Sequence, residues 1–438
     1  MRASIRIPAV TRPATTGWRK PRTRRWAAGL AVLSAGVLPV ALAACGVQGS
    51  SGSSGSSATS SSKAGSPYTI HAILSVTGSA AFLGGSEKAA LEAMQKQVNS
   101  TGGIDGHPLN FAISDNQSVA STSVSLASPL VSQVPVMIVG ALTTVDRPVD
   151  NLATSNGPVI YDLSPGDHPA RGSFVYSASN STTSQTKAFA NFAKMKGWSR
   201  VAAITSTDTS GQDGWTNIQK AVAGSGGAVS VISHQTFDPK AVSVTTQLSQ
   251  IKAANPQALL IWTTGTPLAT VLKGMQQLGM GSVPTMTTNG NASAKQMQQL
   301  ANVLPAQLYF PGAPFQVGPQ NLSGEEKTAV ATFDSAMKAQ GVPVASEGNA
   351  LAWDPALLLV SAVKKLGVNA TAAQINHYIA SQGSFAGING TYNFVTDPSP
   401  DNRGLGISSI YITRWDPSQG HWVAASGPAG QGAPPSGS

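Results

Sequence analysis

The 438-residue chain has one cysteine, few aromatic residues and few charged residues. A single cysteine excludes a disulfide within the chain. Charged residues make up 11% of the sequence and aromatic residues 6%, while glycine is abundant. This composition is normal for a folded α/β protein with many tight turns and does not indicate disorder. The length leaves room for two lobes, each with its own buried core, after a leader and a linker are removed.

Motifs of common enzyme classes are missing as well. The body of the chain has no Gly-x-Ser-x-Gly nucleophile elbow and no Gly-x-x-x-x-Gly-Lys-Ser/Thr loop for ATP. The six histidines lie far apart, without a metal-ligand spacing, and Gly-Met-Gly at 279–281 lacks the third glycine of a dinucleotide site. We therefore expect no catalysis, no cofactor and no metal ligands. An extracellular enzyme is kept as a weaker alternative.

The basic residues are concentrated at the start of the chain. The formal net charge is +9, from 28 Lys and Arg against 19 Asp and Glu. Residues 1–44 hold eight of the basic residues and no acidic ones, which leaves 20 basic against 19 acidic residues in the remainder. A nearly neutral body gives little electrostatic basis for binding a phosphate backbone. We expect no nucleic-acid partner.

Residues 1–44 have the order of a secretory signal, in which a basic stretch precedes an apolar segment from about Trp26 to Ala44. The segment ends in Leu42-Ala43-Ala44-Cys45, which resembles the lipobox of bacterial lipoproteins, where the cysteine receives a diacylglycerol. An uncleaved membrane anchor is the alternative, since the apolar run of about 19 residues is near the lower limit for spanning a bilayer. Arg24-Arg25 leaves Sec and twin-arginine export both open.

Two segments rich in small residues flank the body of the chain. Residues 45–66 are mostly Gly and Ser and predict a flexible linker that follows the lipidated Cys45. Residues 424–438 are rich in Gly, Pro and Ser and predict a disordered tail. Because acyl chains bury many methylene groups, we expect the protein to be held at the outer face of the cell membrane.

From residue 68 onward, short apolar runs alternate with amphipathic stretches, a pattern that predicts βαβ units and parallel sheets. Ser86 can cap a helix that Thr101-Gly102-Gly103 ends, and residues 185–196 predict another helix. The number of strands predicts two sheets. Strands are expected at Tyr68–Ser75, Leu109–Ser114, Val136–Val139, Val159–Tyr161, Val201–Thr205, Leu259–Trp262 and Leu308–Phe310.

Several short markers occur in a fixed order along this body. They are Thr77-Gly78 with Gly84, Asn99–Gly106, Ser114–Ser118, Val139–Thr144, Ser210–Trp215 and Ala352–Asp354. In this order and spacing, residues 68–423 resemble the periplasmic branched-chain amino acid and amide binding family, the ligand-binding components of ABC importers.

The resemblance implies an α/β, two-lobe type I periplasmic-binding-protein fold, each lobe a doubly wound, mainly parallel sheet. Three crossovers would form the hinge. Residues 68–178 with 310–385 would form the first lobe, and residues 179–309 with 386–423 the second. It further implies a monomer that captures a small-molecule solute and hands it to a permease with a separate ATPase. The alternative is a sensory module that reports the solute to a membrane receptor.

Ligands of open α/β sheets bind beyond the carboxyl ends of the strands. Leu142, Thr143 and Thr144 follow one predicted strand, and Ser164 and Gly166 follow the next. In proteins of the similar family, hydroxyl and backbone groups at these two places hold the ligand's carboxylate. A helix cap is an equally good explanation for any one of these hydroxyls.

The opposite lobe departs from the family pattern. Amino-acid binders have an aromatic residue where this chain has Ser210, and an acidic residue where it has Asn289. A buried ammonium group would lack a counter-charge there, unless Asp208 or Asp213 supplies it. A neutral amide or a carboxylate without an amino group is therefore the expected ligand. Candidates for the cleft wall are Phe82, Leu83, Trp215, Trp262 and Thr266.

Overall fold

The computed structural model describes residues 65–398 and 401–435. The predicted signal, Cys45 and all but the last two residues of the predicted linker lie outside these described residues. Two large sheets, one of five strands and one of seven, are each covered by helices on both faces. The predicted two-lobe α/β fold is confirmed.

The first lobe is built on a five-stranded sheet whose neighbouring strands are all parallel. β3 and β4 are buried along their whole length, because helices cover both faces of the sheet and leave the apolar runs no exposed side. The strand order is β2 (Leu109–Asp115), β1 (Tyr68–Leu74), β3 (Val136–Val139), β4 (Val159–Asp162), β5 (Val175–Ser177).

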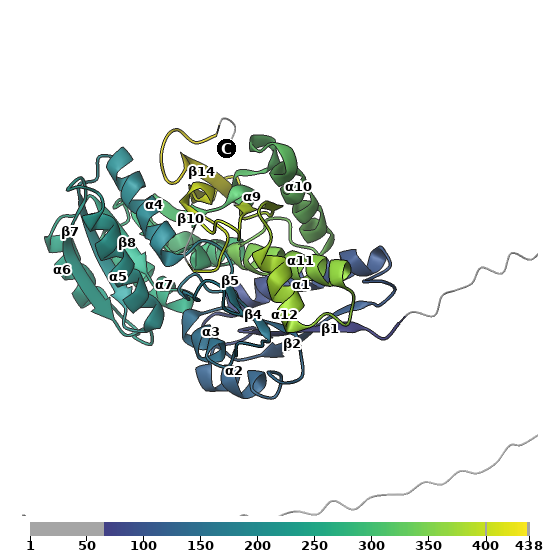
Figure 1. Ribbon diagram of the computed structural model, residues 1–438. Helices are drawn as coiled ribbons and strands as arrows, with labels where there is room; N and C mark the ends of the chain where they lie inside the picture. Colours follow the sequence, from purple (N-terminus) through teal and green to yellow (C-terminus); the bar gives the residue numbers. More distant parts are fainter. Residues whose placement is uncertain (1–64, 399–400, 436–438) are drawn as a thin grey trace, which may run out of the picture. The chain divides into compact units, whose positions relative to one another are not determined.

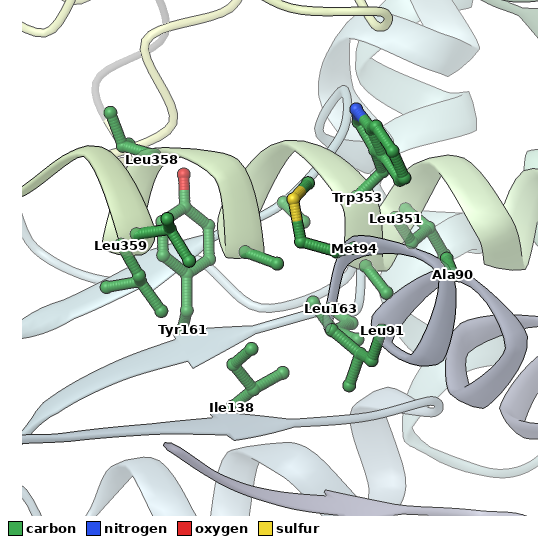
Figure 2. Packing of buried hydrophobic residues seen from close by; sticks show 14 of the residues in the cluster. Ala90, Leu91, Met94, Ile138, Tyr161, Leu163, Leu351, Trp353, Leu358 and Leu359 are labelled. Carbon is green, nitrogen blue, oxygen red and sulfur yellow. The ribbon is translucent and has the colours of Figure 1, made fainter. Parts of the chain in front are cut away.

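Helices from distant parts of the chain cover this sheet. On one face lie α1 (Ala81–Ser100), α10 (Gly324–Ala339), α11 (Glu347–Leu366) and α12 (Ala372–Ala380). The other face carries α2 (Ala120–Ala127) and α3 (Thr143–Asp150), as Figure 1 shows. In Figure 2, Leu91 and Met94 of α1 and Leu359 of α11 meet Ile138 and Tyr161 of the sheet. This contact makes the carboxy-terminal helices part of the first lobe.

The second lobe is built on a seven-stranded sheet, with five parallel strands followed by an antiparallel hairpin at one edge. The strand order is β14 (His421–Pro428), β13 (Tyr411–Asp416), β10 (Leu308–Gly312), β9 (Thr285–Thr287), β8 (Ala258–Trp262), β6 (Arg200–Ser206), β7 (Ser230–Phe237). One face packs on α6 (Thr245–Ala253), α7 (Thr266–Gln277) and α8 (Ala294–Gln299), and the other on α4 (Thr182–Met195) and α5 (Thr209–Ala223).

The chain passes between the two sheets three times, after β5, after β10 and before β13. The first passage agrees with the predicted one near residue 178. The second lies later than predicted, because β10 continues in the second sheet to Gly312 and the short helix α9 (Pro314–Val317) then packs on the first core through Phe315.

The third passage is a correction to the predicted boundary. Residues 386–405 were assigned to the second lobe, yet Ile388, Tyr392 and Leu405 are buried in the core of the first. This segment contains the small hairpin of β11 (Phe385–Ala386) and β12 (Thr391–Tyr392). The chain enters the second lobe only at Ile410, which packs with α4 and β6.

The predicted disordered tail is wrong for its first part. β14 runs to Pro428 and pairs with β13, and Ser426 is fully buried. Trp422 at the start of the strand packs edge to face against Phe310 and Trp415. The Gly and Ser content of this segment suggested a loose tail, but backbone pairing at the edge of a sheet requires no large side chains.

Asp354 of α11 holds the β11–β12 hairpin in place. Its buried carboxylate accepts hydrogen bonds from the backbone N–H groups of Ile388 (2.9 Å) and Asn389 (3.0 Å) and from the Tyr392 hydroxyl (2.9 Å). Hydrogen bonds to a charged acceptor are stronger than neutral ones, and these join segments more than 30 residues apart. The third passage therefore depends on one buried acid.

Replacing Asp354 is expected to make the hairpin segment unfold more easily. Asp354→Ala leaves several buried donors without an acceptor, which costs about 3 kcal/mol or more. The exposed acid Glu325 in the first turn of α10 is the control, because Glu325→Ala is expected to cost less than about 1 kcal/mol. The measurement is urea unfolding followed by circular dichroism. Equal midpoints for the two variants would contradict this role of Asp354.

Candidate functional site

A small cavity lies between the two lobes, at the carboxyl ends of their strands. From the first lobe it is lined by Leu83, Leu142, Thr143, Ser164 and Gly166, and from the second by Ser210 and Trp262. These seven residues were all predicted as ligand contacts. The cavity has a volume of about 20 Å³, room for about one water molecule. The lobes are therefore closed on each other in this structure.

Two hydroxyl groups meet at the first-lobe side of the cavity. Thr143 begins α3 and Ser164 follows β4, and their Oγ atoms lie 2.5 Å apart. The backbone N–H of Gly166 donates to the Ser164 hydroxyl (3.3 Å). A Cβ at position 166 would lie 2.3 Å from the Thr143 Oγ1, so only glycine leaves this hydroxyl in place. The pair can donate hydrogen bonds to a carboxylate or carbonyl oxygen.

The opposite wall is apolar. Trp262 ends β8 and is 2% exposed. A Cβ at Gly214 of α5 would lie 2.1 Å from the Trp262 ring, so a glycine at this position lets the indole pack directly on the helix. Leu83, Leu142 and Leu351 add apolar surface from the first lobe. The cavity thus combines hydroxyl donors on one side with apolar surface on the other.

Four other predicted ligand residues lie away from this cavity. Phe82 lines a separate groove beside α1, and Thr144 is half-buried on α3 without lining the cavity. The backbone N–H of Thr266 donates to the Ser79 carbonyl (3.2 Å), which is a contact between lobes. Asn289 is also in a contact between lobes, described below.

Several cavity residues were missed by the sequence prediction. Thr264 lies two residues after Trp262, so the strand-end rule used for Thr143 would have found it. Thr288 and Gly290 follow β9, a three-residue strand that the sequence pattern did not reveal. The other missed cavity residues are Ala141, Pro165, Thr182 and Leu351.

Asn289 faces a buried carboxylate rather than the cavity. Its Nδ2 donates to Glu347 Oε1 (2.7 Å) at the start of α11 and to the Ser179 hydroxyl (2.9 Å). The Ser179 hydroxyl also lies 3.1 Å from Glu347 Oε1. Burial raises the pKa of Glu347 to about 7, although the hydrogen bonds from Asn289 and Ser179 act to lower it. Asn289, which was expected to influence the choice of ligand, instead forms a contact between the two lobes.

A second polar contact joins the lobes at the surface. His168, in the loop after β4, lies with Nε2 3.1 Å from Asp213 of α5 and with Nδ1 3.0 Å from Asp401. Burial lowers the pKa of His168, but the hydrogen bonds to the two carboxylates outweigh it and raise the pKa to about 9. Asp208 caps α5 through the N–H of Gly211 (2.9 Å). Both acids considered as ammonium partners are therefore engaged elsewhere in this structure.

This fold and site define a class of two-lobed α/β binding proteins. The family model described as "Periplasmic binding protein" matches residues 67–421. The chain belongs to the periplasmic binding protein family. No curated protein matches the chain. Among the described residues, none of the helices is both long and apolar enough to cross a membrane.

Solved structures of similar fold cover most of the chain. An extracellular ligand-binding receptor from Rhodopseudomonas palustris HaA2 is 20% identical, with a TM-score of 0.70 over 82% of this chain and 99% of its own. LivJ, a branched-chain amino acid transporter substrate-binding protein from Streptococcus pneumoniae solved with isoleucine, is 18% identical (TM-score 0.70, 82% and 99% coverage). An R. palustris ABC-transporter solute-binding protein solved with benzoate is also 18% identical (TM-score 0.69, 84% and 97%).

The contact at Glu347 generates a pH prediction. Because the folded protein binds this proton more tightly than the unfolded chain, the contribution of Glu347 to the free energy of unfolding falls as pH rises from about 4.5 to about 7 and then levels off. Glu347→Gln removes this fall. The variant is expected to match the wild type at pH 4.5 and to be more stable at pH 8, by at most about 3 kcal/mol.

Urea unfolding of the two proteins at pH 4.5 and pH 8 checks this expectation, with the exposed Glu325→Gln as control. If the wild type and Glu347→Gln lose the same stability between the two pH values, Glu347 does not carry the raised pKa.

Proposed function

We propose that this protein is the solute-capture component of an ABC importer, which closes its two lobes around a small carboxylate or amide and delivers it unchanged to a permease with a separate ATPase. The observation that carries the proposal is the cavity between the lobes, with the hydroxyls of Thr143 and Ser164 on one side and Trp262 on the other. A solute with a polar oxygen at one end and an apolar body matches both sides.

The ligands of the similar structures support a carboxylate. Isoleucine and benzoate, named for two of these structures, both carry a carboxylate on an apolar body. Benzoate has no ammonium group, which agrees with a site where Asn289 donates to Glu347 instead of facing the cavity. We infer that this chain prefers a carboxylate or amide without an amino group.

The closed cavity of about 20 Å³ cannot hold such a solute. Ligand pockets for small molecules measure about 300–1,000 Å³, so the lobes must move apart for solute entry. The solute would then replace some of the contacts between lobes with contacts of its own and stabilise a closed form for the permease to recognise.

The hydroxyl pair can be tested by substitution. A library of small carboxylates and amides is followed by thermal shift, since a ligand of the folded state raises its melting temperature. Thr143→Val is expected to weaken binding of any hit about tenfold or more, because a hydrogen bond to a charged group is lost. Thr144→Val is the matched control, since Thr144 does not line the cavity, and it should bind as the wild type does.

Hits that bind equally well to Thr143→Val and to the wild type would contradict the assignment of this hydroxyl. Each hit is also recovered after incubation and examined by NMR. Conversion to a product would favour an enzyme over a binding protein.

We also propose that the protein is exported and held at the outer face of the membrane by a lipid on Cys45. The support is the sequence Leu42-Ala43-Ala44-Cys45 after an apolar segment, followed by a Gly and Ser linker. Cys45→Ser is expected to abolish incorporation of labelled fatty acid and to prevent lipoprotein processing, whereas Ser50→Ala should leave both intact. Labelling of the Cys45→Ser variant at the wild-type level would overturn the anchor.

A further inference from the structure

Three buried carboxylates converge behind the hydroxyl pair. Asp146 lies on α3, Asp162 ends β4 and Asp167 lies in the loop that follows. Each offers an oxygen within 4.8 Å of those of the other two, and the residues are 0%, 0% and 1% exposed. Two ligands on opposite sides of a calcium ion lie about 4.8 Å apart at usual calcium–oxygen distances. The three oxygens are therefore close enough to share one cation.

Each of these acids has oxygen atoms without a hydrogen-bond donor. Both oxygens of Asp146, and the Oδ2 atoms of Asp162 and Asp167, are buried and accept no hydrogen bond from a donor in the described part of the chain, although Asp162 lies within hydrogen-bonding distance of both other acids. The remaining oxygens are oriented by the protein, because Asp162 Oδ1 accepts from the Ser164 N–H (2.7 Å) and Asp167 Oδ1 from Arg147 Nε (2.8 Å). In each of these two acids, Oδ1 is held by a hydrogen bond and Oδ2 is available to a ligand.

The charge of the group must be neutralised. Glu87, fully buried with both oxygens unpartnered, and Asp150 lie close enough to add their charge to that of Asp146. Arg147 neutralises only part of this charge through its contact with Asp167. Burying carboxylates without a counter-charge costs several kcal/mol per group. Either a cation or bound protons must offset this cost.

A surface cavity reaches one of the three acids. A cavity of about 570 Å³ is lined by Asp150, Asp167, Arg147 and the loop that contains His168. Asp167 is the one of the three convergent acids that lines this cavity, and Asp150, Arg147 and His168 line it as well. Asp146 and Asp162 are fully buried and do not line this cavity, so a cation would have to reach them past Asp167.

We propose that Asp146, Asp162 and Asp167 bind a divalent cation of the calcium or magnesium class. All three ligands are carboxylate oxygens, which such hard cations prefer, and the group contains no sulfur or imidazole donor that would favour zinc or copper. The site is distinct from the solute cavity and does not depend on the proposed solute. It adjoins that cavity, since Asp162 bonds to the Ser164 backbone and Asp146 follows Thr143 on the same helix.

Bound protons are the competing way to neutralise the group. Burial raises the pKa of Asp146 and Asp162 well above the usual carboxyl range, and a proton on one of them would let the two share a hydrogen bond. If protons neutralise the group, replacing one of the acids should stabilise the folded protein whether or not metal is present. Cation binding predicts that removing an acid abolishes a stabilisation seen only with the metal present.

The test uses purified protein stripped with a chelator, to which calcium chloride or magnesium chloride alone is added. One of the two salts is expected to raise the melting temperature of the wild type saturably, and calorimetry should give one site per chain. Asp146→Asn should weaken this binding at least tenfold, and so should Asp162→Asn if the first variant fails to fold. Asp334→Asn, which changes an acid of α10 outside the group, should behave as the wild type.

Two results would overturn the proposal. Wild-type protein that shows no saturable binding of either cation, together with an Asp146→Asn variant that is more stable than the wild type, would mean that protons neutralise the group. Equal cation binding by the wild type, Asp146→Asn and Asp162→Asn would place the cation elsewhere on the surface. Because no solute is present in either assay, these outcomes leave the proposed solute binding to its own test.

Discussion

The structure depends on one buried polar contact, in which Asn289 of the second lobe and Ser179 of the first passage meet the carboxylate of Glu347 on α11. Glu347 is 1% exposed, and its Oε2 has no partner in the described residues. A buried carboxylate with incomplete hydrogen bonding is costly, which is why burial shifts its pKa upward. The contact joins the lobes, but the Glu347 carboxylate remains costly to bury. Separation of the lobes would expose it to water and remove that cost.

This balance suits a protein whose lobes must both open and close. Other contacts between lobes are also polar, such as Glu347 N–H to the Ala292 carbonyl (2.9 Å) and the Trp422 indole N–H to the Ala345 carbonyl (3.0 Å). None of the large apolar clusters extends from one sheet to the other, because each packs around a single sheet. Polar contacts can be exchanged for water on opening, whereas a shared apolar core would oppose it.

The sequence predicted those elements whose pattern is local and strong. The seven predicted strands are all present, because runs such as Val136–Val139 are apolar throughout and buried on both faces. Three of the missed strands lack such a signal. β7 (Ser230–Phe237) is only half-buried and mostly polar, while β5 and β9 have three residues each. Residues 386–405 were misplaced because Asp354, more than 30 residues earlier, fixes their position.

The site was predictable where it follows directly from strand ends. Thr143, Ser164 and Trp262 were found in this way, since parallel strands bring their carboxyl ends to one edge. Asn289 was placed in the ligand site by resemblance, but the carboxylate that it contacts is 58 residues away and had no local signal. The convergence of Asp146, Asp162 and Asp167 was likewise hidden, because folding brings these acids together from separate segments and no short motif of the sequence contains all three.

The most direct test of lobe movement is a distance between spin labels on the two lobes. Val119 and Val242 are 44% and 98% exposed and follow edge strands of the two sheets, so labelled Val119→Cys and Val242→Cys in a Cys45→Ser background report the opening between them. Without solute, the account predicts a population with a longer distance than the closed structure gives, which shortens when a stabilising carboxylate is added. A single distance equal to that of the closed structure, unchanged by such a solute, would contradict it.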